Sequence, residues 1–467
     1  MTPILLLEIN EIPWRLLDRY AGRPELRHLH RFLEGSHQFT SRAVDSGELS
    51  PWVTWPTIHR GMNNERHGIK NLGQDPASFR GKAIWEEIRE AGGSIGICGS
   101  MQSWPAREPG AGGFYIPDTF AHDERCYPPY LNGLQAFNLS QVRKNARVVN
   151  GSIPGFPELR NLASALARSG IRLRTGARIA AHLAHELLDR SQSVKRPVFQ
   201  AVLFWDVFRK HFKPERPPHF STFFTNHVAG VMHRYWKDVF PEDFPGQATS
   251  GEKSREWLMR FALGVLDDML ADVLQWTESN PDLVVVFASS MGQAAVHRET
   301  HEGTELVVED LGLLMSRAGA ARQDYRSLLA MAPQVAVEIG DPDKAAGVRA
   351  TLEGAYCGEN THFIGVQTIG PSLSITVHTP ALRDMASDHF VIGGERVRWS
   401  DAGIRKQEIE PGSAYHVPEG SLAVYCRRTL GQPLRKSREL VNADRIKPWL
   451  LAINRKGYGE INALGAR

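Results

Sequence analysis

Hydroxyl side chains gather at the beginning of one short segment of the sequence. Ser50-Pro51 is typical of the N-cap and first residue of a helix, and Thr54 and Thr57 follow within two turns. The amino end of a helix offers free N–H groups and the positive end of its dipole, so it favours an anion. A hydroxyl placed there is either a nucleophile toward a bound anionic group or a plain helix cap.

Acidic and imidazole side chains stand at three other places. Glu8 ends an apolar run, where an unpaired charge would be costly to bury, so a ligand or ion-pair role is expected. His416 lies between Gly412 and Pro418, which favours a site role over a core one. His233 stands among large apolar residues, and both a site role and that of a satisfied core histidine remain open.

Buried strands are expected to position these side chains. Residues 4–7, 94–98 and 282–288 are short apolar runs, typical of strands covered on both faces of a parallel sheet. Helical patterns at 83–89 and 255–276 alternate with them, which indicates a sheet with helices on both sides. Ligands of such sheets bind beyond the carboxyl ends of the strands. The polar residues after residues 7 and 288 are therefore expected to border the site.

The chain is expected to be one large α/β domain over residues 1–467. The irregular stretch 125–200 predicts an insertion or lid, and residues 320–410, with alternating runs such as 373–377, predict a smaller β-containing subdomain.

Composition excludes several classes of protein. Of the 467 residues, 42% are hydrophobic and 23% charged, which is typical of a globular chain. The net charge of only +3 argues against a dedicated nucleic-acid binder. The four cysteines lie far apart with no CxxC pair, so a reducing cytoplasm is expected. No stretch predicts a signal peptide or a membrane span.

Four segments occur in the order of a known family. They are residues 50–61 with 64–69, residues 227–236, residues 264–292 and residues 414–420. Together they resemble the alkaline phosphatase superfamily, in particular its type I phosphodiesterase/nucleotide pyrophosphatase branch. They are similar to its nucleophile helix, its D-x-x-x-H-x-x-W segment, its S-D-H-G motif and its H-x-P-x-G segment. The resemblance implies an α/β/α sandwich like that of alkaline phosphatase and covers most of the chain.

The resemblance implies a nucleophilic hydroxyl that acts on phosphorus beside two metal ions. Counting back from Gly61 places the nucleophile at Ser50, whereas the local sequence Thr54-Trp55-Pro56 is similar to the family's T-F-P and places it at Thr54. We rank these two nearly equal and Thr57 behind them. The expected metal ligands are Glu8, Asn10, His233 and His416, and the expected substrate contacts are Asn10, Trp55 and His59. Such ligands suit Zn²⁺ or Mn²⁺.

Several family ligands are replaced in this sequence. The Asp after the first strand falls at Asn10, with Glu8 and Glu11 as possible substitutes; the Asp-His pair falls at Ser290-Met291, and another Asp falls at Ala229. We therefore expect a reduced metal site and, as the leading function, hydrolysis or transfer of a small phosphate (or sulfate) ester or phosphodiester. The alternatives are a degenerate member that binds a phosphorylated ligand or a partner protein without metal-dependent hydrolysis, and a changed group-transfer reaction.

Overall fold

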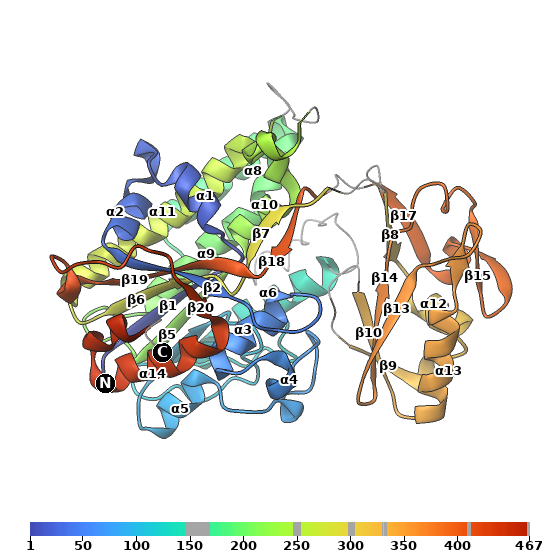
Figure 1. Ribbon diagram of the computed structural model, residues 1–467, viewed down its shortest axis with the longest axis horizontal. Helices are drawn as coiled ribbons and strands as arrows, with labels where there is room; N and C mark the ends of the chain where they lie inside the picture. The colour runs from blue at the N-terminus through green and yellow to red at the C-terminus, as the bar shows by residue number, and fades with distance from the viewer. Residues whose placement is uncertain are drawn as a thin grey trace.

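An eight-stranded sheet forms the centre of the computed structural model, which describes residues 1–145, 169–245, 254–297, 304–328, 330, 334–408 and 412–464 (Figure 1). Its strands are β1 (Ile4–Ile9), β2 (Ser36–Arg42), β3 (Ile95–Cys98), β4 (Phe114–Ile116), β5 (Phe220–Thr225), β6 (Val284–Ala288), β19 (Glu419–Cys426) and β20 (Leu440–Asn442). They are ordered β20-β2-β19-β6-β1-β5-β3-β4. In this sheet β19 alone runs antiparallel to its neighbours. The predicted α/β fold with a mostly parallel sheet is confirmed.

Helices cover both faces of this sheet. On one face lie α1 (Trp14–Tyr20), α2 (Arg27–Glu34), α9 (Arg196–His211), α10 (His227–Val239) and α11 (Glu256–Ser279). On the other lie α3 (Pro51–Arg60), α5 (Ile84–Glu90) and α14 (Ile446–Lys456), with the short α4 (Asn64–His67) beside α3. Side chains of a strand alternate between faces, so Leu5 and Leu7 enter the first core and Ile4 and Leu6 the second. The apolar run of β1 is thereby buried on both sides.

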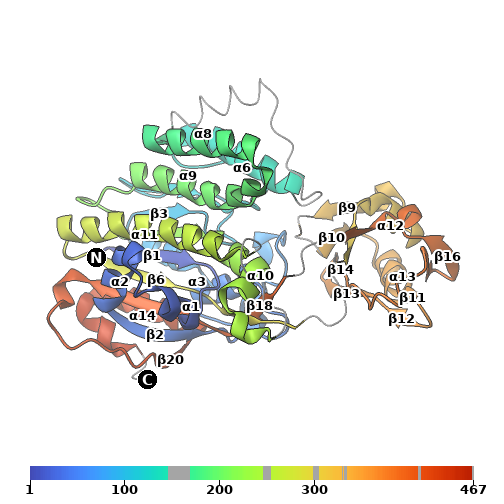
Figure 2. The same ribbon diagram turned by 90° about the horizontal axis from the view of Figure 1, so that it is seen from above.

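The segment predicted as an insertion contributes an outer helical layer. Within residues 125–200 the structure describes α6 (Asn132–Asn145), α8 (Leu173–Leu188) and the beginning of α9, whereas residues 146–168 lie outside the described part. Figure 2 shows α8 outside α9, on the side away from the central sheet, whereas Gln135 of α6 donates to Pro117 O and Asp118 O just after β4. Among the described residues no helix combines the length and the apolar character that crossing a membrane would require.

A smaller lobe lies beside the large sheet (Figure 1). It contains β8 (Thr304–Val308), α12 (Leu311–Arg317), β9 (Tyr325–Leu328), β10 (Gln334–Ile339), α13 (Pro342–Glu353), β11 (Tyr356–Cys357), β12 (Thr361–His362), β13 (Ile364–Ile369), β14 (Ser372–Val377), β15 (His389–Ile392), β16 (Glu395–Arg398) and β17 (Ile404–Glu408). Its core, from Leu306 to Ile404, is separate from the two cores of the large sheet. The sequence predicted a smaller subdomain at residues 320–410. The core of this lobe begins before residue 320 because β8 pairs with β17.

Candidate functional site

Three side chains from distant parts of the sequence meet beyond the carboxyl end of β1. Glu11 lies 2.8 Å (Oε2) from Nε2 of His233 and 3.4 Å (Oε1) from Nε2 of His416. One ligand atom from each of the three lies within 4.8 Å of the others. Within the described part of the chain, no other group of three or more His, Cys, Asp or Glu side chains is gathered in a way that could hold a metal ion.

The backbone at Glu11 is held in an unusual conformation. Its φ is 61°, a left-handed value that costs a residue with a side chain about 1 kcal/mol or more. The carboxylate is buried and accepts hydrogen bonds from Asn10 Nδ2 (2.6 Å) and from Gln293 Nε2. Gln293 comes from β7 (Gly292–Ala295), which follows β6. Such strain persists only where its surroundings enforce it, and here it directs a carboxylate at two imidazoles.

Both histidines are fixed by backbone carbonyls. His233, on α10, donates Nδ1–H to Ala414 O (3.1 Å), and His416, on β18 (Ala414–Val417), donates Nδ1–H to Leu49 O (2.7 Å). A carbonyl only accepts, so Nδ1 carries the proton in each ring. Each Nε2 then points at an acceptor oxygen of Glu11. This arrangement requires a proton or a cation between nitrogen and oxygen, and metal-ligating histidines have the same outer hydrogen bond.

The charges of this cluster are coupled. Burial by itself would raise the pKa of Glu11, but hydrogen bonds and charge from His233 and His416 outweigh it and hold that pKa well below its usual range. Burial by itself would lower the pKa of His416, yet its hydrogen bond and charge interaction with Glu11 raise it above the ordinary value. The cluster therefore contains an ionised carboxylate that attracts positive charge at Nε2.

Ser50 shares a cavity of about 540 Å³ with this cluster. It is the N-cap residue of α3 and its carbonyl accepts the first helical hydrogen bonds, but its hydroxyl makes no capping hydrogen bond. His416 is tied to the preceding carbonyl, Leu49 O, so the start of α3 and the imidazole are held side by side. Ser50 therefore lines the same cavity as Glu11, His233 and His416, and its hydroxyl is not used as a helix cap.

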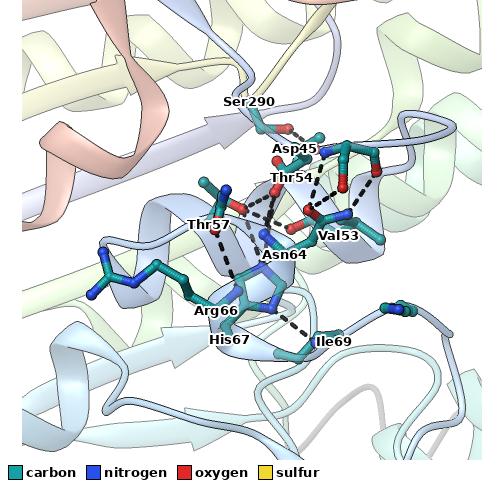
Figure 3. A network of polar contacts seen from close by, with 12 residues as sticks. Asp45, Val53, Thr54, Thr57, Asn64, Arg66, His67, Ile69 and Ser290 are labelled. Carbon is teal, nitrogen blue, oxygen red and sulfur yellow. Dashed lines mark hydrogen bonds and ion pairs between the residues drawn. The ribbon is translucent and has the colours of Figure 1, made fainter. Parts of the chain in front are cut away.

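Thr54 and Thr57 lie inside the protein instead (Figure 3). Both are fully buried, and neither lines the cavity. The Thr54 hydroxyl is 2.8 Å from that of Ser290, and Thr57 donates to Asp45 Oδ1 at 2.6 Å. These contacts fasten α3 to the end of β6 and to the loop before the helix.

His67 completes the Thr57 network. Its Nδ1 accepts from Ile69 N–H (3.0 Å), so Nε2–H donates to Thr57 Oγ1 at 3.1 Å (Figure 3). Burial lowers the pKa of His67 to about 4 and raises the pKa of Asp45 to about 6. The neutral form of His67 is thus favoured at neutral pH, and its part in the fold is to hold the turn after α3.

The remaining predicted residues lie near the cluster but differ in what they contact. Asn10 lines the cavity and accepts from Trp55 Nε1 at 2.9 Å. The carboxylate of Glu8 lies 2.7 Å from His59 Nε2, in the buried space between β1 and α3, and is not part of the three-residue cluster. Trp55 and His59 are both buried and do not line the cavity. They position α3 on the sheet.

From the sequence, Glu11 was expected only as a possible substitute for the Asp after the first strand, and Gln293 was not expected at the site. The available signal was the run Glu8-Ile9-Asn10-Glu11 at the strand end, where three polar residues leave the core together. Alternation along β1 would place Glu8 and Asn10 on one face. The left-handed backbone conformation of Glu11 ends that alternation. A glycine at position 11 would have indicated such a conformation, but this position is a glutamate.

Comparisons with known proteins reveal distant structural similarity. Neither a family of related sequences nor a curated protein matches this chain. Human ectonucleotide pyrophosphatase/phosphodiesterase 5 is similar over 99% of both chains, with a TM-score of 0.44. An inactive form of the murine protein in complex with AMP (97% of this chain, 95% of that one, TM-score 0.43) and phosphonoacetate hydrolase from Sinorhizobium meliloti in complex with phosphonoformate (97% and 96%, TM-score 0.43) are also similar. All three are 12% identical to this chain, so its own residues have to identify its site.

Proposed function

We propose that this protein hydrolyses or transfers the phosphoryl group of a phosphate ester or phosphodiester, with Ser50 as the nucleophile. The observation that carries the proposal is the meeting of Glu11, His233 and His416 with the uncapped Ser50 hydroxyl in one cavity at the carboxyl end of the sheet. Cavities at this edge are the usual ligand sites of parallel α/β folds. The ordered motifs of the alkaline phosphatase superfamily in the sequence support the same reaction class.

Glu11, His233 and His416 would hold one divalent cation, and two imidazoles with a carboxylate suit Zn²⁺ or Mn²⁺. When bound, such an ion supplies positive charge that polarises the phosphoryl group. The donor set supports one ion: at the positions where the family has a second Asp-His pair, Ser290 is hydrogen-bonded to Thr54 and Met291 is buried. These contacts support the proposal of a reduced metal site.

The residues of the chain would contribute binding and orientation. The N-cap position keeps the Ser50 hydroxyl at the positive end of α3, where Trp52 N–H has no residue within the helix to bond. Arg234, an exposed residue of α10 that lines the cavity, adds positive charge toward an anionic substrate. His416 holds the Leu49 carbonyl and thereby the backbone just before the nucleophile.

The test is turnover of p-nitrophenyl phosphate and bis-p-nitrophenyl phosphate with added Zn²⁺ or Mn²⁺. We expect metal-dependent release of p-nitrophenol that Ser50→Ala lowers by at least about 100-fold, with Ser437→Ala, an exposed serine outside the cavity, as the matched control. No turnover with either metal would contradict the proposal. Loss with Thr54→Val but not with Ser50→Ala would move the nucleophile to Thr54.

A second candidate function is binding of a phosphorylated ligand without hydrolysis. The observation that favours it is the uncharged, buried pair Ser290 and Met291 where the family has an Asp-His pair. Elemental analysis of the purified protein separates the two functions: one equivalent of Zn or Mn supports the hydrolase, and none supports the binder.

A further inference from the structure

The cavity beside Ser50 is lined by two kinds of side chain. Its acidic and basic lining side chains other than histidine are Glu11, Glu48 and Arg234, which come from the end of β1, the loop before α3 and α10. A second group of lining residues is apolar and comes mostly from α9 and its surroundings: Val194, Val198, Ala201, Phe204, Phe224 and Val231. A molecule that contacts both groups would combine a charged part with an apolar part.

The apolar wall is built by the helix that follows the predicted insertion. Val198, Ala201 and Phe204 recur at three-residue steps, which places them on one face of α9. Val198 and Ala201 are buried, whereas Phe204 and Phe224 are half-buried and pack against the two cores with part of their surface. Apolar surface left open next to a reactive cluster is typical of a ligand site.

We propose that the substrate is a phosphate ester of a hydrocarbon alcohol, alkyl or prenyl, whose chain lies along the α9 wall while its phosphoryl group meets Ser50 and the Glu11 cluster. This inference rests on the proposed function. A hydrocarbon chain gains free energy when it covers apolar surface. A nucleoside would instead bring sugar hydroxyls and base edges to this wall, where Gln200 is the one amide that α9 supplies to the cavity.

The experiment is calorimetric titration of the whole protein, in Zn²⁺ or Mn²⁺, with n-alkyl phosphonates of two, four, six and eight carbons, with geranyl phosphonate and with AMP. Phosphonates keep their carbon–phosphorus bond, so their binding is measured apart from ester hydrolysis. AMP is an ester, so it is compared with octyl phosphonate in the Ser50→Ala protein. We expect affinity to rise about fourfold with each methylene, and octyl or geranyl phosphonate to bind more tightly than AMP. Comparison of the octyl and geranyl compounds distinguishes straight from branched chains.

Two substitutions test the wall itself. Ala201→Trp fills space along the apolar wall and should remove the gain from chain length, whereas Leu203→Trp, on the same helix but not lining the cavity, should preserve it. Should Ala201→Trp fail to fold, as judged by circular dichroism, Phe204→Ala serves instead. It removes part of the contact with the chain and should weaken octyl phosphonate binding by about tenfold.

The outcomes separate this inference from the proposed function. Chain-length dependence without turnover of any ester would uphold the apolar subsite and contradict the hydrolase. Turnover of aryl esters with equal affinity for all alkyl phosphonates would uphold the hydrolase and overturn the apolar subsite. Tighter binding of AMP than of octyl phosphonate would also overturn it, as would unchanged chain-length dependence in the Ala201→Trp protein.

Discussion

Replacing Glu11 by Gln tests the cluster most directly, because it removes the charge and preserves the shape. The carboxylate accepts from Asn10 and Gln293 and faces Nε2 of His233 and of His416. The amide introduced by Glu11→Gln would have one acceptor oxygen instead of two. Its NH₂ group would therefore face the NH₂ group of Asn10 or of Gln293, and one of these two hydrogen bonds would be lost. Losing a hydrogen bond to a charged group costs about 1.5–3 kcal/mol, and the thermal midpoint should fall accordingly.

The effect of Glu11→Gln on metal binding should be larger than its effect on stability. Residues that merely orient a metal ligand change affinity by about 10–100-fold. We therefore expect removal of the one anionic ligand to weaken Zn²⁺ binding by at least about 100-fold, or about 2.8 kcal/mol. The assay is titration calorimetry with Zn²⁺ at pH 7.5.

Glu8→Gln is the matched control for this experiment. It makes the same change three residues earlier, within β1, where the carboxylate contacts His59 instead of the cluster. Equal Zn²⁺ affinity in wild type and Glu11→Gln, or an equal loss in both variants, would refute the assignment. An independent readout is the pKa of His416 in the metal-free protein, which Glu11 raises and which should fall in Glu11→Gln.

Three further predictions concern stability. Burial lowers the pKa of His227 to about 4, so its neutral form stabilises the fold: this contribution is present above about pH 6.5 and is lost as the pH falls through 4, by about 3 kcal/mol at most. Thermal midpoints between pH 7 and 4 should decline less steeply in His227→Gln, and an identical slope would contradict this origin. Gly292→Ala would put Cβ 2.1 Å from Glu419 O and should cost about 2 kcal/mol or more in urea unfolding, whereas Gly264→Ala, which meets nothing within 4 Å in α11, should be neutral or stabilising. Thr54→Val leaves the buried Ser290 hydroxyl without this partner and should cost about 1–2 kcal/mol, whereas Ser50→Ala removes no capping hydrogen bond and should change stability by less than about 0.5 kcal/mol; equal thermal shifts would contradict this contrast.

Local hydrophobic patterns predicted the central sheet because the residues of each strand show, by their apolar character, that the strand is buried. The residues 4–7 and 283–288 are apolar throughout, and both runs form strands covered on two faces. The local sequence did not indicate which hydroxyl side chain of this segment lines the cavity. Ser50 at the N-cap and Thr54 in α3 lie one helical turn apart and both are buried, but of the two only Ser50 lines the cavity, whereas Thr54 bonds to Ser290, 236 residues away.

The net charge of the Glu11 cluster depends on several nearby positions that carry uncharged side chains. Ala229, where the resemblance of the sequence implies a carboxylate, lies four residues before His233 on α10, and its carbonyl accepts from Gln293 Nε2 at 3.2 Å. The same Gln293 amide donates to Glu11. A carboxylate from the end of β1, held by this bridge, thus stands beside His233 in place of one from α10. With Asn10, Ala229, Ser290 and Met291 all uncharged, Glu11 supplies the single negative charge among these positions. One divalent cation would leave the cluster with a net charge of about +1, which attracts an anionic phosphoryl group, whereas two would leave about +3 in a largely buried space, at a high cost in desolvation.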